Sequence, residues 1–258
     1  MTAPVNLDST MALLKSELDV VFGKRLVSII LYGSAVFDDL APGYGDLDFL
    51  AVIAGDLSSD DCHSLVDIRK NLRARSRGIL AHMLEGAFLP RPMLDPAVQG
   101  GAFWWGTTGE RPWNANQLGA LALHVIRERG RVVYGADARV DIAPQGDAAL
   151  MADVLGFCES ARLHGEAGRL HSIDWLLTSA RLLLWLKERR LSSKSEAADW
   201  ALEHARGAWR MELPKAKHLR LNPSCCDEPD WRKWLISLAP SIQEAREEVE
   251  NQLQACGS

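Results

Sequence analysis

Two aspartates and a glycine-serine pair in the N-terminal half of the chain have the residue types and spacing of a reactive site. Asp46 and Asp48 lie two positions apart at the start of an apolar run, so in a strand both side chains project from one face. Two carboxylates this close repel each other unless a cation lies between them. Because all the ligands are oxygens, the pair suits Mg²⁺, with phosphate oxygens and water completing the coordination.

Gly33 and Ser34 follow an earlier apolar run, Leu26–Leu31. A glycine at this place lets the backbone approach a phosphate closely, and the serine offers a hydroxyl and an amide to the same group. A phosphate-binding turn followed by two metal-binding carboxylates catalyses in-line displacement at phosphorus. Either feature alone is common on protein surfaces, but their order between two apolar runs favours a functional site.

Glu85 is the candidate general base for such a displacement. It interrupts the apolar run Ile79–Leu89, which we expect to be a strand with Glu85 on the face shared by Met83 and Ala87. A carboxylate on an apolar face needs a reason to be there. The alternative is a glutamate on an edge strand that faces water. His82 falls on the opposite face of the expected strand, where it is packed or solvated.

The elements that position these residues follow from hydrophobic periodicity. Helical spacing covers residues 8–22, 116–129 and a segment opened by Ser58–Asp61, and strand patterns cover 26–31, 47–53, 79–89 and 131–134. Residues 96–112 are expected to be irregular. After a linker at 144–146, only helical patterns remain, over 148–166, 173–190, 194–205 and 231–254. We therefore expect an α+β protein: an α/β domain with a small mixed sheet over residues 1–143, followed by an α-helical bundle over 144–258.

The composition limits the possible functions. With 47% hydrophobic and 24% charged residues, the chain is an ordinary globular protein. A formal net charge of -5 argues against a nucleic-acid partner and weakly favours a cationic small-molecule substrate. No signal peptide is visible in the first ten residues and no apolar run is long enough for a bilayer, so we expect a cytoplasmic protein without a membrane partner, monomeric or weakly dimeric. The five cysteines lack metal-ligand spacing, and adjacent Cys225 and Cys226 are expected to be reduced rather than joined.

Segments of both halves resemble known nucleotidyltransferases. Residues 31–35 (LYGSA) and 46–50 (DLDFL) resemble the signature of the DNA polymerase β-like nucleotidyltransferase superfamily. Residues 177–181 (LTSAR) and 197–201 (AADWA) resemble segments in the helical domain of the aminoglycoside (streptomycin/spectinomycin) adenylyltransferase family. The resemblance implies an N-terminal nucleotidyltransferase domain that binds ATP and Mg²⁺, with Gly33 and Ser34 at the triphosphate, Asp46 and Asp48 at the metal and Glu85 as the base.

The same resemblance implies that Arg181 and Lys194 bind the ATP phosphates. Lys194 has independent support, because Ser193 and Glu196 are spaced as a capping box that opens a helix there. Backbone N–H groups and an ammonium could then meet one anion together. Arg181 lies among leucines and is alternatively a structural ion-pair partner.

The residues that bear on the identity of the acceptor differ in part from the family pattern. Gly45 stands where the family more often has a serine. In the members that handle streptomycin, a tryptophan beyond the base strand and an acidic helical-domain residue contact the substrate. Trp105 is the candidate for the first and Asp174 or Glu166 for the second, with Glu85 also close to the substrate. Trp105 and its neighbour Trp104 are alternatively core residues.

We therefore expect an enzyme of antibiotic resistance that transfers AMP to an aminoglycoside hydroxyl in a cleft between the two domains. One alternative acceptor is another hydroxylated metabolite or a protein side chain. A different class is a non-catalytic nucleotide-binding or antitoxin-like module. The intact pair Asp46 and Asp48, together with Glu85, argues against that class, because a binding module has no need for all three.

Overall fold

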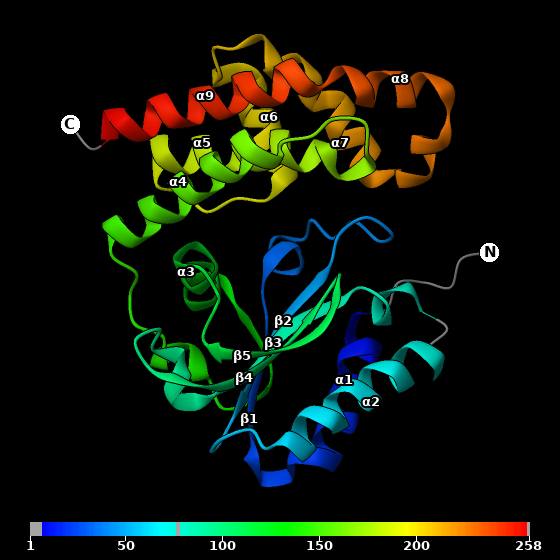
Figure 1. Ribbon diagram of the computed structural model, residues 1–258, viewed down its shortest axis with the longest axis vertical. Helices are drawn as coiled ribbons and strands as arrows, with labels where there is room; N and C mark the ends of the chain where they lie inside the picture. Colours follow the sequence, from blue (N-terminus) through cyan, green and yellow to red (C-terminus); the bar gives the residue numbers. More distant parts are fainter. Residues whose placement is uncertain (1–6, 76–77, 257–258) are drawn as a thin grey trace. The chain divides into compact units, whose positions relative to one another are not determined.

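A computed structural model of the chain describes residues 7–75 and 78–256 and divides the chain into two units (Figure 1). The first unit comprises the chain up to Val36 together with Gly45–Gln145, and the second comprises Phe37–Tyr44 together with Gly146–Ser258. The short segment Phe37–Tyr44 thus belongs to the helical unit, although it connects two strands of the first unit. Its sequence gives no sign of this.

The first unit is built on one six-stranded mixed sheet. Its strands are β1 (Leu26–Leu31), β2 (Leu47–Ile53), β3 (Leu84–Pro90), β4 (Gln99–Gly106), β5 (Gly109–Ala115) and β6 (Arg131–Gly135). They lie in the order β5-β4-β3-β2-β1-β6. Only β2 and β3 run parallel, and the other neighbours are antiparallel. The prediction of a mixed sheet in an α+β protein is confirmed.

Helices cover both faces of this sheet. Helices α1 (Leu7–Phe22) and α2 (Ser59–Arg75) lie on one side and α3 (Ala120–Arg129) on the other (Figure 1). Because side chains alternate along a strand, Ile30 and Leu50 pack with Ile126 of α3 in one core cluster. The buried residues of the second core layer include Leu14, Leu18, Ile29 and Phe49.

Two sequence predictions for this unit are wrong in detail. The strand expected over 79–89 begins only at Leu84, because Ile79–Ala81 form a turn of 3₁₀-helix and His82 follows it. His82 is therefore exposed in a turn rather than on a strand face. The stretch expected to be irregular over 96–112 contains the β4–β5 hairpin. Its aromatic residues favour strands, and the glycines that suggested irregularity mark the turn, where Gly109 has φ +113°.

The second unit is a bundle of α-helices, as predicted. Its helices are α4 (Asp147–His164), α5 (Ile173–Glu188), α6 (Lys194–His204), α7 (Leu213–Leu221), α8 (Pro229–Ser237) and α9 (Ala239–Cys256). Helix α5 is central: it packs against α6, α7 and α9, and most of its aliphatic residues are fully buried.

The helix expected over 231–254 is two helices, α8 and α9, which separate at Leu238. Pro240 explains the break, because proline lacks the N–H that a continuous helix needs yet fits the first turn of a new one. Helix α7 was not predicted. Among the described residues no helix has the length and apolarity to cross a membrane, and all five cysteines are free thiols.

Candidate active site

The glycine-serine turn packs directly against the second aspartate. Strand β1 pairs with β2, and beyond its end the Tyr32 N–H donates to the Asp48 carbonyl (3.1 Å). The chain then enters a 3₁₀-helix, Gly33–Phe37, with Gly33 at φ +64°. A Cβ at Gly33 would lie 1.9 Å from Asp48 Oδ2. Only glycine allows this conformation and this approach together, so the predicted turn and the predicted metal carboxylate form one site.

The parallel pairing of β2 and β3 brings the candidate base to the same place. Asp48 is in register with Glu85, and two residues further Leu50 is in register with Ala87. Leu50 and Ala87 belong to one core cluster, so Asp48 and Glu85 project from that same face of the sheet. Asp46, which is exposed, precedes β2 by one residue.

The buried hydroxyl of Tyr32 is subject to the negative charge of all three carboxylates. Tyr32 is buried, and its pKa is raised well above the usual value first by burial and then by the charges of Asp48, Glu85 and Asp46. The three carboxylates therefore act in the same direction on one buried group. Such a concentration of negative charge favours a bound cation.

The fit of Mg²⁺ to this site rests on two aspartates rather than on a complete ligand set. Within residues 7–75 and 78–256, no group of three or more His, Cys, Asp or Glu side chains is arranged to hold a metal ion. Mg²⁺ is commonly held by one or two carboxylates, with phosphate oxygens and water in the other positions. Asp46 and Asp48 fit that kind of site.

Glu85 is held by a residue that the sequence analysis did not identify. The backbone N–H of Thr107 and its hydroxyl both donate to Glu85 Oε2, at 2.9 Å and 2.7 Å. Thr107 lies in the turn between β4 and β5. The sequence signal that would have predicted this hairpin is the pair of glycines that flank the turn, Gly106 and Gly109, which the sequence analysis assigned to an irregular stretch.

Trp105 is a core residue in this structure. Its side chain is 0% exposed and packs edge-on against Phe49 and Phe88, with ring centroids 5.7 Å and 4.8 Å away. Its neighbour Trp104 stacks on Trp113. A fully buried ring has no surface for a ligand, so the burial favours the core alternative over the predicted substrate contact.

In the second unit, Lys194 begins α6 at the predicted cap. The Ser193 hydroxyl accepts the Glu196 N–H (3.0 Å), while the Glu196 carboxylate pairs with Arg190 instead of completing a capping box. Lys194 Nζ lies 2.5 Å from Asp174 Oδ1. Two residues predicted to contact different ligands thus form one ion pair.

The Asp174 carboxylate is stabilised in its charged form. Burial alone would raise its pKa, but the hydrogen bond from His171 and the ammonium of Lys194 hold the pKa well below its usual range. The ring of Tyr44 lies 4.9 Å from that of His171. Burial and the nearby Asp174 charge raise the Tyr44 pKa.

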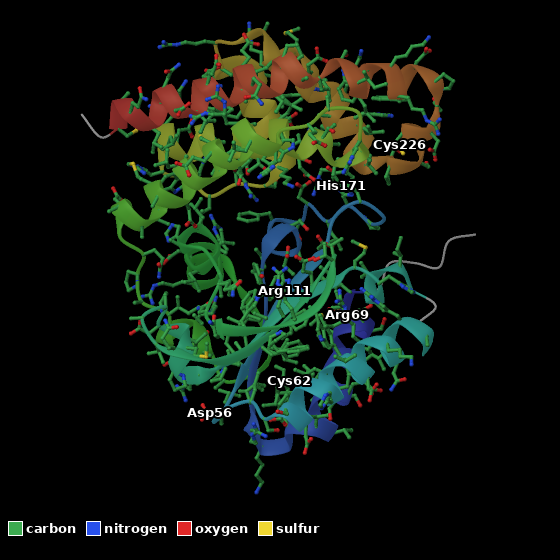
Figure 2. The ribbon with its side chains drawn as sticks, in the orientation of Figure 1. Asp56, Cys62, Arg69, Arg111, His171 and Cys226 are labelled. Atoms are coloured by element: carbon green, nitrogen blue, oxygen red, sulfur yellow. The ribbon has the colours of Figure 1, made fainter. Side chains whose placement is uncertain are left out.

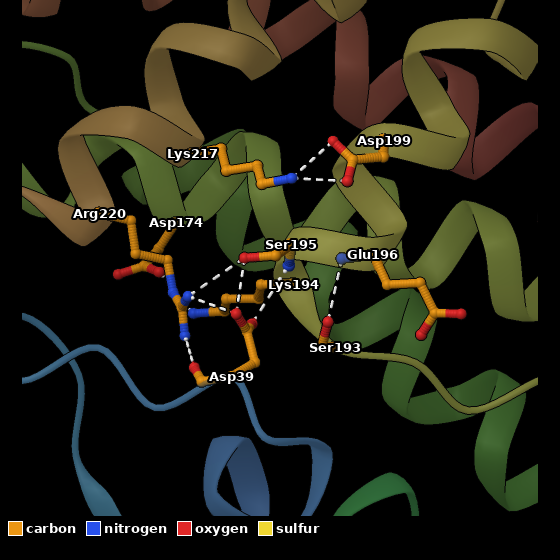
Figure 3. A network of polar contacts seen from close by, with 9 residues as sticks. All are labelled: Asp39, Asp174, Ser193, Lys194, Ser195, Glu196, Asp199, Lys217 and Arg220. Atoms are coloured by element: carbon orange, nitrogen blue, oxygen red, sulfur yellow. Dashed lines mark hydrogen bonds and ion pairs between the residues drawn. The ribbon is translucent and has the colours of Figure 1, made fainter.

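A second buried network anchors the segment Phe37–Tyr44 (Figure 3). Asp39 Oδ1 lies 3.0 Å from Arg220 Nη1 and accepts the Ser195 hydroxyl (2.6 Å). Asp39 Oδ2 accepts the Ser195 backbone N–H (3.2 Å). The Arg220 side chain is 3% exposed. The loop between the glycine-serine turn and the aspartate pair is therefore fastened to the start of α6 and to α7.

A pocket of about 380 Å³ lies within the second unit, around the end of α4 and the start of α5. Its lining includes both acidic candidates, Glu166 and Asp174, and it is completed by Phe157, His164, Arg169, His171, Ser172, Trp175 and Thr178. His171 is labelled in Figure 2. Arg181 is half-buried and follows Asp174 by two helical turns, so both lie on one face of α5.

Comparisons with known proteins bear on both units. Residues 157–245 match the family described as aminoglycoside adenylyltransferase, C-terminal domain. The structure is similar to the crystal structure of the spectinomycin adenyltransferase AAD(9) from Enterococcus faecialis with ATP and spectinomycin. That match has a TM-score of 0.69 and 16% sequence identity, and covers 96% of this chain and 100% of the other. At this identity the likeness establishes a shared fold. None of the curated protein sequences compared with the chain matches it.

Proposed function

We propose that the protein is a nucleotidyltransferase of the aminoglycoside adenylyltransferase type, a proposal that the match of residues 157–245 to the C-terminal domain of that family supports. The protein moves AMP from ATP, with Mg²⁺, to a hydroxyl group of an aminoglycoside-type antibiotic of the streptomycin and spectinomycin class. One observation carries the proposal: Gly33, Asp48 and Glu85 come from three separate segments and meet at one end of the neighbouring strands β1, β2 and β3.

In the reaction, Glu85 accepts the proton of the acceptor hydroxyl as its oxygen attacks the α-phosphorus of ATP. The bond from that phosphorus to the oxygen bridging the β-phosphate breaks, and pyrophosphate leaves. Asp46 and Asp48 would hold Mg²⁺, which when bound neutralises the negative charge that develops on the phosphates. Gly33 allows the chain to approach the triphosphate, and Ser34 donates to it.

Arg181 and Lys194 supply the cationic side chains for the phosphates in this proposal. The Lys194 side chain is 24% exposed and begins a helix, where N–H groups favour anions. Arg181 lies on the same face of α5 as Asp174. A bidentate arginine and a helix-start lysine are common phosphate ligands.

The acceptor would use the pocket of the second unit. Glu166 and Asp174 both line it, and each desolvated ammonium or guanidinium group of a cationic antibiotic needs such an acceptor. Glu166 is the better probe, because its pairing with Arg169 is long (3.8 Å) and exposed. Glu166→Gln should raise the KM for the antibiotic and leave the KM for ATP unchanged.

The metal assignment is tested with Asp48→Asn. The protein is incubated with ATP and Mg²⁺ and with streptomycin or spectinomycin, and the AMP adduct is detected by mass. We expect Asp48→Asn to lose transfer by about 10²-fold or more, since it removes charge stabilisation at the reacting phosphate. Asp19→Asn, at an exposed position of α1, is the matched control. Full turnover in Asp48→Asn would remove the metal role of this residue.

The base is tested separately with Glu85→Gln. This variant should still bind ATP, as measured by its thermal shift with ATP and Mg²⁺, but should lose transfer because an amide cannot accept the proton. Glu203→Gln, exposed on α6, controls for the change of charge. An adduct on a different hydroxylated compound, with none on either antibiotic, would overturn the acceptor class and leave the reaction standing.

A further inference from the structure

The turn between β4 and β5 is built against the candidate base. Gly86 of β3 is in register with Trp105 of β4, so the end of the hairpin lies beside Glu85. The turn residue Thr107 donates twice to Glu85 Oε2, from its backbone N–H at 2.9 Å and from its hydroxyl at 2.7 Å. We propose that Thr107 is a positioning residue, which fixes the Glu85 carboxylate for proton transfer; this rests on the proposed function.

The contact is specific to one carboxylate oxygen. The terminal torsion of a glutamate is broad, so a carboxylate without a fixed partner samples many orientations. Two donors from one residue to Oε2 restrict that torsion. Oε1 is then the oxygen that receives the proton of the acceptor hydroxyl. Because reactivity depends steeply on the placement of the reacting groups, the orientation of Glu85 contributes to the chemical step rather than to binding.

A buried arginine fixes the position of Thr107 relative to Glu85. Arg69 of α2, labelled in Figure 2, is 2% exposed. Its Nη2 donates to the carbonyl oxygens of Leu84 (3.2 Å) and Gly106 (3.0 Å), and its Nη1 pairs with Glu110 of β5 (3.0 Å). Leu84 directly precedes Glu85, and Gly106 directly precedes Thr107. One guanidinium therefore ties together the backbones on both sides of the contact, which is the kind of support that precise placement requires.

The chain offers a matched set of substitutions. Thr107→Val keeps the shape and the backbone N–H but removes the hydroxyl donor, and Thr107→Ser restores that donor. Thr108→Val makes the same chemical change at the next position, which is equally exposed. In the full-length protein we expect Thr107→Val to lower kcat about tenfold, because the Glu85 carboxylate is then less precisely placed for proton transfer. The KM for ATP and the unfolding temperature should stay unchanged.

The positioning role of Thr107 is tested by steady-state AMP transfer to streptomycin or spectinomycin, together with thermal unfolding of each variant. Recovery of kcat in Thr107→Ser and a normal Thr108→Val would support the positioning role. An unchanged kcat in Thr107→Val, or a loss matched by a lower unfolding temperature and not rescued by serine, would overturn it.

The same assay separates this inference from the proposed function. If Glu85→Gln is inactive and Thr107→Val is normal, only the role of Thr107 falls. If Glu85→Gln keeps full activity, Glu85 is not the base and the role of Thr107 fails with it. If the protein transfers AMP to another hydroxylated compound and to neither antibiotic, only the acceptor class of the proposed function fails.

Discussion

Two groups of carboxylates, one in each unit, have neighbours of opposite charge. In the first unit Asp46, Asp48 and Glu85 all act to raise the pKa of the buried Tyr32 hydroxyl. In the second unit Asp39 lies 3.0 Å from Arg220 and Asp174 lies 2.5 Å from Lys194. There the pKa of Asp174 is lowered instead, so the neighbouring charges are of the opposite sign.

This difference in the neighbouring charges distinguishes carboxylates that could take part in a reaction from carboxylates that stabilise the fold. A carboxylate paired with a buried cation stabilises the fold only if both partners are present. A group of carboxylates that all act on one buried hydroxyl is a candidate site for a cationic ligand. Under the proposed function, Asp46, Asp48 and Glu85 are the reactive carboxylates, whereas Asp39 is a structural carboxylate of the second unit.

The largest effect is expected from a substitution in the glycine-serine turn beside Asp48. Gly33→Ala would place a Cβ 1.9 Å from Asp48 Oδ2 at φ +64°, so either the turn or the aspartate must move. A displacement of about 1 Å costs roughly 10²-fold in rate, and we expect a loss of this size in AMP transfer. The control is Gly101→Ala, where an added Cβ has no atom within 4 Å. Normal AMP transfer in Gly33→Ala would contradict the claim that the turn and Asp48 form one site.

The second prediction concerns the buried ion pair of Asp39 and Arg220. Arg220→Met leaves the carboxylate of Asp39 buried without its cation and should lower the free energy of unfolding by about 3–5 kcal/mol. Lys217→Met removes the half-buried partner of Asp199, whose own side chain is 66% exposed, and should cost only about 0–1 kcal/mol. Urea unfolding measures both. Equal losses of unfolding free energy in the two variants would contradict the difference between a buried and a more exposed ion pair. The double variant Asp39→Asn with Arg220→Met should recover part of the loss caused by Arg220→Met alone.

The smallest expected effect is on the pH dependence of stability. Because the folded-state pKa of Asp174 is lowered, its contribution is present above the unfolded-state pKa of about 3.9 and is lost as the pH falls below it. Asp174→Asn lacks this contribution. The difference in unfolding free energy between the wild type and Asp174→Asn should therefore be largest at neutral pH and shrink in acid. A difference that grows as the pH falls would reverse the sign assigned to Asp174.

Local sequence patterns were sufficient to predict an element wherever its bounds depend only on its own residues or on those next to it. Strands β1 and β2 have the predicted bounds, because alternating and aliphatic runs between glycine-rich turns leave few alternatives. The cap of α6 at Ser193 was predictable for the same reason. The hairpin carrying Trp104 and Trp105 was missed, since its glycines resembled an irregular loop until pairing partners were known. Pro240, within an otherwise helical pattern, was the overlooked sign that α8 and α9 are separate.

The sequence by itself was enough to predict the reaction class, since Gly33, Ser34, Asp46 and Asp48 lie within one short stretch and the prediction rests on their types and spacing. Tertiary structure decided what surrounds them. It placed Thr107 on Glu85, buried Trp105, and fastened Asp39 to Arg220 across 181 positions of sequence. The physical reason is that periodicity reports which face of an element is buried, whereas pairing between distant segments depends on packing and charge compensation that only the folded chain supplies.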